Sequence, residues 1–303
     1  MKWNRIGYGT WPLAGDISGS LAYGKVNDEE SKLALKCAFD NGINVYDTAD
    51  FYGYGHVERL IGEVLSEYRN DIVLITKGGM ISNDGKQDFS PRHLLTSFFQ
   101  SLDQLKTNYI DIYMLHSPPL SILEDGVVLD LLKFLVKSNL IKEYGISLIG
   151  PNDGKEAIEK YGFKIIEVNY NLLDIRAEKN GLFELCKNQS VKVIGRTPLA
   201  QGLLTGKFQF TNDKSDRRQS WTPEGVERRT RIYKKMLLVL GNNVYTDAQN
   251  CLRFCLSNPI INVIIPGMKT ENEVMENLKA LTQPYLTNDE EANIKDIYEE
   301  EKL

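Results

Sequence analysis

The chain has no excess of positive charge. Its 303 residues contain 36 Lys and Arg against 41 Asp and Glu, which gives a formal net charge of −5 at pH 7. Domains that bind nucleic acids usually carry a basic stripe or a cluster of Lys and Arg on one face. No Arg-rich arm or basic run occurs in this sequence. Nucleic acid is therefore not an expected partner.

Cysteine, histidine and long apolar runs are also scarce. The chain has four cysteines and three histidines, which suggests no disulfide framework and fits a reducing compartment. No spacing of His, Cys and carboxylates is typical of a metal site. No apolar run is long enough to cross a bilayer, and the first residues do not resemble a signal peptide. We expect a cytoplasmic protein without a metal or a membrane partner.

Short apolar runs alternate with amphipathic stretches along the chain. This alternation is typical of βαβ units and of a parallel sheet. The expected strands are Arg5–Thr10, Asn44–Asp47, Ile72–Lys77, Ile110–His116, Glu143–Ser147, Ile165–Asn169, Lys192–Thr197 and Asn262–Ile265. Because α/β barrels of this length are often one domain, the sequence predicts a single α/β domain over residues 1–303. Its fold class is a (β/α)₈ TIM barrel with an additional helix near the C-terminus.

The amphipathic stretches predict the helices of the barrel. Ser90 before Pro91, and Asn27 before three acidic residues, are helix start signals. Thr270 and Glu273 predict a capping box at the last barrel helix. The expected helices are Asp28–Asn41, His56–Glu67, Pro91–Leu105, Glu124–Ser138, Gly154–Lys160, Ala177–Lys187 and a longer helical region from Pro223 to Ser257.

The most irregular stretch is the polar loop Gly206–Glu224, which follows the seventh expected strand. A long polar loop at this place is either a lid over the barrel mouth or a surface insert. Arg217 and Arg218 in this loop either bind an anionic substrate or lie in solvent. Trp11, just after the first expected strand, is the best candidate for an aromatic wall of a substrate pocket.

Four polar residues stand where expected strands end. Asp47, Lys77 and His116 each close a strand, and Tyr52 follows Asp47 by five residues. Side chains at the carboxyl ends of barrel strands face the active-site mouth. Three adjacent strands would therefore bring an acid, a phenol, an amine and an imidazole together. Each residue alone could be incidental, but their joint placement favours a catalytic site.

These four side chains suit proton transfer coupled to hydride transfer. Reduction of a carbonyl needs a proton donor, and a tyrosine such as Tyr52 can serve although its unperturbed pKa is about 10. A nearby ammonium, here Lys77, lowers that pKa. Asp47 would hold the lysine in place, and His116 would orient the carbonyl oxygen by a hydrogen bond.

Five segments resemble the aldo-keto reductase superfamily, and they occur in the order found in that family. They are Asp47–Gly62, Thr76-Lys77-Gly78, Asp111–His116, Pro198–Lys207 and Ile265–Lys269. The resemblance covers nearly the whole chain. It implies a barrel that binds NADPH in an extended form without a Rossmann fold. It also implies the roles given above for the four catalytic candidates.

The resemblance further implies the residues around the nicotinamide. Ser147 matches a serine that bonds to the carboxamide, and Glu167 stands where a glutamine usually contacts the same group. A carboxylate can accept from the amide NH₂ but cannot donate to its carbonyl. Leu148 replaces a common asparagine. Arg196 replaces an aromatic that often stacks on the ring, and a guanidinium plane can stack in the same way.

At the other end of the cofactor, Lys269 and Thr270 match positions that contact the 2′-phosphate of NADP. Glu273 falls where many relatives have arginine or glutamine, and a carboxylate there repels a phosphate. Asn277 matches an asparagine at the adenine. NADP(H) is the expected cofactor and NAD(H) is possible. The resemblance also assigns to the cofactor site Thr10, Trp11, Asp47, Pro198, Leu199, Gln201, Gly202, Lys207 and Gly267.

The predicted function is NAD(P)H-dependent reduction of an aldehyde or ketone to an alcohol, or the reverse. Hydride would leave nicotinamide C4, and Tyr52 would donate the proton. The expected partner is a small carbonyl or sugar-like substrate. Leu148 and Glu167 keep a second hypothesis open, a redox-neutral sugar epimerase or eliminase. A third hypothesis is a nicotinamide-binding redox sensor that acts on another protein.

Overall fold

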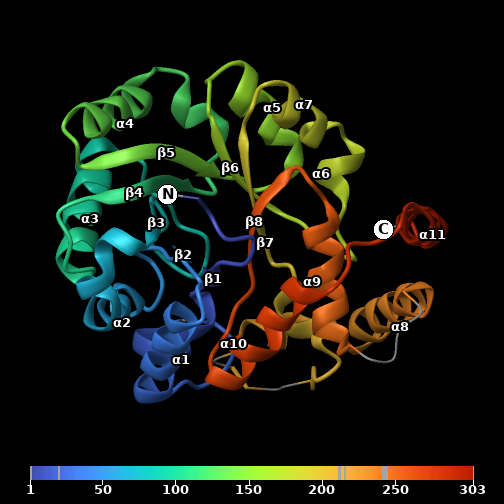
Figure 1. The fold of residues 1–303 in the computed structure, drawn as a ribbon. Coiled ribbons are helices and arrows are strands. Elements are labelled where there is room, and N and C mark those ends of the chain that lie inside the picture. Colours follow the sequence, from blue (N-terminus) through green and yellow to red (C-terminus); the bar gives the residue numbers. More distant parts are fainter. Residues whose placement is uncertain (1, 20, 211–212, 215, 241–244, 303) are drawn as a thin grey trace.

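The barrel strands are confirmed in a computed structural model, which describes residues 2–19, 21–210, 213–214, 216–240 and 245–302. Eight parallel strands form one sheet in chain order. They are β1 (Tyr8–Gly9), β2 (Val45–Asp47), β3 (Val73–Gly78), β4 (Ile110–His116), β5 (Ile141–Ser147), β6 (Ile165–Asn169), β7 (Lys192–Arg196) and β8 (Ile261–Ile265). Figure 1 shows them in the middle of the molecule with helices around them.

The sheet closes between its first and last strands. The amide of Gly7 donates to the carbonyl of Ile264 at 2.8 Å, and the amide of Ile264 donates to the carbonyl of Arg5 at 2.9 Å. A Cβ on Gly9 would lie 2.6 Å from the carbonyl oxygen of Ile265, so only glycine allows this approach. β1 is shorter than the expected Arg5–Thr10, because its first residues pair with β8 through isolated bridges.

The helices lie outside the strands and include the predicted C-terminal addition. α8 and α11 lie side by side at the edge of the barrel (Figure 1), joined by an ion pair of 2.6 Å between Lys235 and Glu300. The helices are α1 (Asp28–Asp40), α2 (His56–Leu65), α3 (Pro91–Gln104), α4 (Val127–Lys137), α5 (Pro151–Glu159), α6 (Arg176–Lys179), α7 (Leu182–Asn188), α8 (Pro223–Val239), α9 (Asp247–Ser257), α10 (Glu271–Leu278) and α11 (Asn288–Glu300).

Two local predictions are wrong. The expected helix Ala177–Lys187 is divided into α6 and α7, because Gly181 between them has a φ of +80°, which an L side chain rarely adopts. The capping box at α10 is incomplete. The Thr270 hydroxyl accepts from the amide of Glu273 at 3.2 Å, but the Glu273 carboxylate accepts from the amide of Lys269 at 2.6 Å instead of returning to Thr270.

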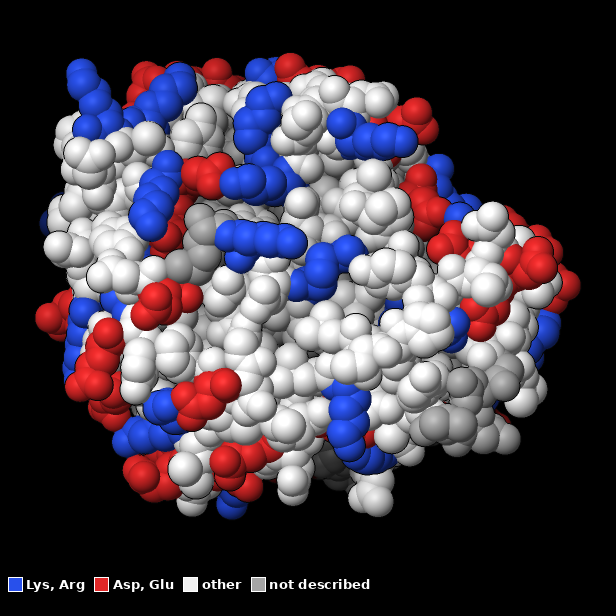
Figure 2. Space-filling model, in the orientation of Figure 1, with Lys and Arg blue, Asp and Glu red and all other residues white. Residues whose placement is uncertain are grey.

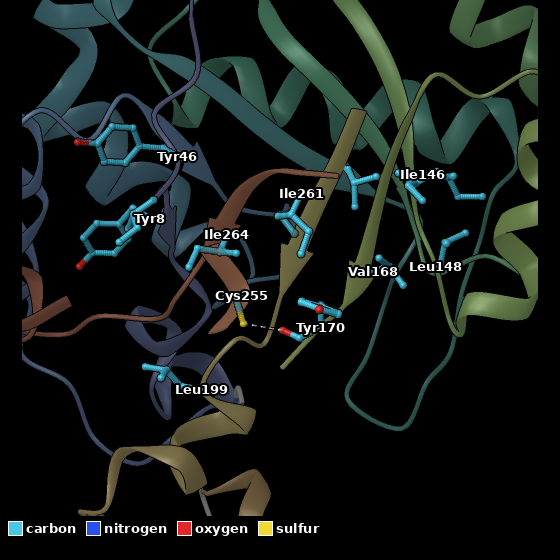
Figure 3. Packing of buried hydrophobic residues seen from close by; sticks show 14 of the residues in the cluster. Tyr8, Tyr46, Ile146, Leu148, Val168, Tyr170, Leu199, Cys255, Ile261 and Ile264 are labelled. Atoms are coloured by element: carbon cyan, nitrogen blue, oxygen red, sulfur yellow. Dashed lines mark hydrogen bonds between the residues drawn. The ribbon is translucent and has the colours of Figure 1, made fainter. Parts of the chain in front are cut away.

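The hydrophobic core has an outer and an inner part. The outer part lies between strands and helices, and Figure 3 shows Tyr46, Ile146 and Ile264 in it. There the Cys255 thiol donates to the carbonyl of Tyr170 at 3.5 Å. The inner part fills the barrel with Val45, Val73, Ile75, Ile112, Met114, Ile165, Ile194, Val263 and Ile265.

The inner part of the core determines where the polar residues point. Side chains alternate between the two faces of a strand, so a residue two places beyond an interior one also faces inward. In five strands that residue is polar, and it lies at or next to the carboxyl end in all of them except β6, where Glu167 is the middle residue. The successive pairs are Val45 and Asp47, Ile75 and Lys77, Met114 and His116, Ile165 and Glu167, and Ile194 and Arg196.

Charged side chains of both signs occur on the face shown in Figure 2. Basic groups gather across its upper half, and acidic groups lie mainly toward its rims. None of the helices in the described ranges is both long and apolar enough to cross a membrane.

Candidate active site

A cavity of about 950 Å³ opens at the carboxyl ends of the strands. Asp47, Tyr52, His116, Glu167 and Arg196 all line it. Active sites of (β/α)₈ barrels lie at this end, because the loops that follow the strands meet there. The catalytic candidates Asp47, Tyr52 and His116 therefore share one cavity, and Lys77 lies directly behind them.

Lys77 is fully buried and bonds to Asp47. Its Nζ donates to both carboxylate oxygens, at 2.6 and 2.7 Å, and to the carbonyl of Thr48 at 3.0 Å. Burial lowers the pKa of Lys77, but the carboxylates of Asp47 and Glu167 raise it further, so the net direction is upward. Lys77 is thus a fixed positive charge, held by the carboxylate of Asp47 and the carbonyl of Thr48.

Tyr52 lies between this charge and the cavity. Its ring centre is 5.4 Å from Lys77 Nζ, 4.8 Å from the ring centre of Trp11 and 5.8 Å from that of His116. Burial raises the pKa of Tyr52 above its ordinary value, and Lys77 lowers it by less. Lys77 therefore lowers the pKa of Tyr52, but burial raises this pKa by more. The phenol is protonated at neutral pH.

His116 is neutral in this environment. Burial lowers the pKa of its imidazole well below the ordinary value, and the positive charges of Lys77, Arg196 and Arg217 lower it further. Its Nδ1 atom is buried and has no hydrogen-bond partner among the residues that the structure describes. A neutral imidazole can both donate and accept a hydrogen bond. His116 is thus equipped to bind a polar group in the cavity.

Glu167 brings a second carboxylate to Lys77. Glu167 Oε2 lies 3.4 Å from Lys77 Nζ, and Glu167 Oε1 accepts from the Ser147 hydroxyl at 3.1 Å. Burial raises the pKa of Asp47, and the negative charge of Glu167 raises it further against the effect of Lys77. One ammonium is therefore shared by two buried carboxylates.

Arg196 supplies the remaining positive charge. Its Nη2 donates to the carbonyl of Leu148 at 2.8 Å, and its Nε lies 3.9 Å from Glu167 Oε1. The sequence marks Glu167 and Arg196 as two separate departures from the family pattern. The structure places them next to each other, so together they add no net charge to the cavity floor.

The resemblance assigns a set of residues to the cofactor site. Most of them lie on the cavity wall, and three do not. Thr10 donates its hydroxyl to the carbonyl of Asp47 at 2.8 Å, Ser147 lies behind Glu167, and Thr270 caps α10. Those on the wall, besides Asp47, Glu167 and Arg196, are Trp11, Pro198, Leu199, Gln201, Gly202, Lys207, Gly267, Lys269, Glu273 and Asn277.

The loop after β7 has a left-handed backbone at two successive residues. Gln201 has a φ of +59° and Gly202 a φ of +91°, and the amide of Gly202 donates to the carbonyl of Leu199 at 2.9 Å. The side-chain oxygen Oε1 of Gln201 is buried without a hydrogen-bond partner in the described part of the chain, and Glu167 Oε2 accepts no hydrogen bond there although it lies within ion-pair distance of Lys77. These buried acceptors fit the amide and hydroxyl donors of a nicotinamide nucleotide. No group of metal-ligating residues occurs in the described ranges.

Several residues on the cavity wall were not found from the sequence, and Tyr23 and Arg229 are two of them. Tyr23 follows β1, pairs with Asp216 across the mouth, and accepts through its carbonyl from Lys269 Nζ. Arg229 lies in α8, outside the irregular loop. Both positions are distant in sequence from every motif, so no sequence signal could have indicated them.

Comparison with known proteins identifies the family. The model of the aldo/keto reductase family matches residues 5–299. The chain belongs to this family. It is 31% identical to "Uncharacterized oxidoreductase YqkF" of Bacillus subtilis over 259 residues, which cover 84% of this chain and 82% of that protein.

Two solved aldo-keto reductases have the same fold. The enzyme AKR11C1 of Bacillus halodurans in its holo form superposes with a TM-score of 0.79 at 25% identity, over 97% of this chain and 91% of that one. An aldo/keto reductase of Klebsiella pneumoniae, solved with NADP and acetate, gives a TM-score of 0.71 at 22% identity, over 98% and 92%. The chain is thus a (β/α)₈ oxidoreductase of a family that typically uses NADP(H).

Proposed function

We propose that this aldo-keto reductase reduces a small aldehyde or ketone with NADPH, or catalyses the reverse oxidation of the alcohol. The observation that carries the proposal is the placement of Tyr52. Its ring lies 5.4 Å from the buried Nζ of Lys77 and next to the neutral imidazole of His116, on the wall of one cavity. A protonated phenol beside a fixed ammonium is a proton donor whose conjugate base is stabilised.

In the reductive direction, Tyr52 donates its proton to the carbonyl oxygen. His116 hydrogen-bonds to the same oxygen and orients it, and as a neutral group it does not compete as a proton donor. Lys77 stabilises the phenolate that remains, and Asp47 keeps Lys77 in position. NADPH, when bound, supplies the hydride to the carbonyl carbon, so that one hydride and one proton convert the carbonyl to an alcohol.

The cofactor would lie along residues that already line the cavity. The carboxylate of Glu167 would accept from the carboxamide NH₂, and Arg196 would offer its guanidinium plane to the ring. The loop at Gln201 and Gly202 would lie beside the phosphates. Lys269 provides the positive charge for the 2′-phosphate and favours NADPH, against the opposing charge of Glu273.

A fluorescence titration tests the cofactor assignment. We expect NADPH to quench the tryptophan fluorescence at lower concentration than NADH, because only NADPH carries the 2′-phosphate that we assign to Lys269. Addition of a range of aldehydes and ketones to the NADPH complex should then oxidise the cofactor. Retention of bound cofactor without net oxidation by any carbonyl would instead favour the redox-neutral or sensor hypothesis. Absence of binding of either nucleotide would contradict the proposal.

A further inference from the structure

Two arginines on the cavity wall have no acidic partner. Arg217 begins the short 3₁₀ helix Arg217–Ser220, and Arg229 lies in the first half of α8. Neither has a carboxylate within ion-pair distance in the part of the chain that the structure describes. An arginine guanidinium carries five donors suited to carboxylates and phosphates. The two side chains therefore have unused binding capacity that faces the cavity.

The other basic side chains of the wall already have partners. Arg218 pairs with Asp216 at 2.5 Å, Lys207 pairs with Glu276 at 2.7 Å, Arg196 donates to the carbonyl of Leu148 at 2.8 Å, and Lys269 donates to the carbonyl of Tyr23. Among the described residues of the wall, Arg217 differs from these side chains, and Arg229 differs only in its terminal nitrogens, since its Nε donates to the carbonyl of Gly225.

Contacts hold the Arg229 side chain and the Arg217 backbone at the mouth and leave the outer nitrogens of both guanidinium groups available. The guanidinium of Arg229 lies 4.3 Å from the ring centre of Trp221, and its Nε donates to the carbonyl of Gly225 at 3.0 Å. The amide of Arg217 donates to the carbonyl of Ala22 at 2.9 Å, which anchors the loop to the segment after β1.

Arg217 and Arg229 line the same cavity as Tyr52 and His116. Arg218 also lines it, but donates to the carbonyl of Gln201 at 3.3 Å and belongs with the loop that we assign to the cofactor phosphates. We therefore assign Arg217 and Arg229 to the substrate and Arg218 to the cofactor.

We propose that Arg217 and Arg229 bind an anionic group, a carboxylate or a phosphate, on the carbonyl substrate. The carbonyl oxygen of that substrate then lies at Tyr52 and His116. This inference rests on the proposed carbonyl reductase function. It predicts a preference for small aldehydes that carry a negative charge a few bonds from the carbonyl carbon.

Two aldehydes of equal chain length test this preference. Succinic semialdehyde carries a carboxylate, and butanal carries none. We expect wild-type kcat/KM to be at least about tenfold higher for succinic semialdehyde, since one charged hydrogen bond has an effect of this size. Arg217→Gln and Arg229→Gln should each lower the ratio of the two kcat/KM values by about tenfold. Arg231→Gln is the matched control, because Arg231 also lies in α8 but pairs with Glu301 at 3.2 Å, and it should keep the wild-type ratio.

The dissociation constant of NADPH, measured by fluorescence on each variant, separates the alternatives. An unchanged constant together with a reduced ratio supports the inference. A weaker NADPH complex with an unchanged ratio would assign the arginines to the cofactor phosphates and overturn it. Equal wild-type kcat/KM for the two aldehydes would also overturn it, while turnover of butanal would leave the carbonyl reductase proposal intact. Failure to reduce any carbonyl would reject both.

Discussion

Glu167 Oε2 lies 3.4 Å from Lys77 Nζ, and Asp47 Oδ1 lies 2.6 Å from the same atom. The ammonium that we propose as the stabiliser of the Tyr52 phenolate is thus shared by two carboxylates. Both carboxylates raise the pKa of Tyr52, whereas Lys77 lowers it. The charge state of Glu167 therefore bears directly on how readily Tyr52 loses its proton.

Glu167→Gln should lower the pKa of Tyr52, because it removes a negative charge next to Lys77. In the oxidative direction Tyr52 must accept a proton, so the rate rises with pH as the phenolate forms. We expect the midpoint of this rise to move to lower pH by about one unit. The measurement is the pH dependence of kcat for alcohol oxidation. Ser147→Ala, which removes the hydrogen bond of Glu167 but keeps its charge, should leave the midpoint in place; an equal shift in both variants would argue against the charge effect.

Lys77→Met should destabilise the fold. It would leave Asp47 buried without a counter-charge, while Glu167 would keep only Arg196, and loss of one member of a buried ion pair costs about 3–5 kcal/mol. The free energy of unfolding, measured in urea at neutral pH, should fall by this amount. Adding Asp47→Asn should restore part of the loss, because it removes the uncompensated charge. A double variant less stable than Lys77→Met would contradict this explanation.

Glu273→Gln should strengthen NADPH binding. The Glu273 carboxylate is held next to Lys269 by the amide of that residue, at 2.6 Å, so its negative charge stays near the site assigned to the 2′-phosphate. Glutamine keeps an acceptor for the amide and removes the charge. We expect the dissociation constant of NADPH to fall by about three- to tenfold, with little change for NADH. Glu271→Gln, at the exposed start of the same helix, is the control; equal effects of both variants would reject a local role of Glu273.

Glu58 should make stability depend on pH. It is buried behind β3, where its Oε1 accepts from the Thr76 hydroxyl at 2.6 Å, and burial raises its pKa from 4.5 to about 7. The raised pKa favours the folded state below pH 4.5, and this contribution is lost as the pH rises through 7. As the pH rises from 4.5 to 7, the free energy of unfolding of the wild type should fall by about 3 kcal/mol relative to that of Glu58→Gln. Urea denaturation at several pH values measures the difference; a constant difference would show that Glu58 does not ionise on unfolding.

The sequence was sufficient for the barrel because local and global signals agree. The eight apolar runs became the eight strands, and the alternation along each strand placed Asp47, Lys77 and His116 at one mouth. The sequence was insufficient where a single backbone angle or a single hydrogen bond determines where a helix begins or how it is capped. The positive φ of Gly181 divides a helix, and the Glu273 carboxylate bonds to Lys269 instead of completing a capping box.

The sequence was also insufficient for contacts within the candidate site. Motifs indicated Glu167 and Arg196 one at a time, but their mutual distance of 3.9 Å and the approach of Glu167 to Lys77 depend on the closure of the barrel. Arg229 lies in a helix without a motif, and only the fold brings it to the cavity. The balance between burial and Lys77 at Tyr52 also depends on packing, which spacing along the chain does not encode.

The most direct test of the account is a single-turnover measurement on Tyr52→Phe. NADPH-loaded wild type and variant are mixed with an aldehyde that the wild type reduces, and oxidation of the bound cofactor is followed. The account predicts that the variant binds NADPH as the wild type does but oxidises it about 10²–10⁴-fold more slowly, because phenylalanine cannot supply the proton. A variant that binds NADPH and retains most of the wild-type rate would show that Tyr52 is not the proton donor.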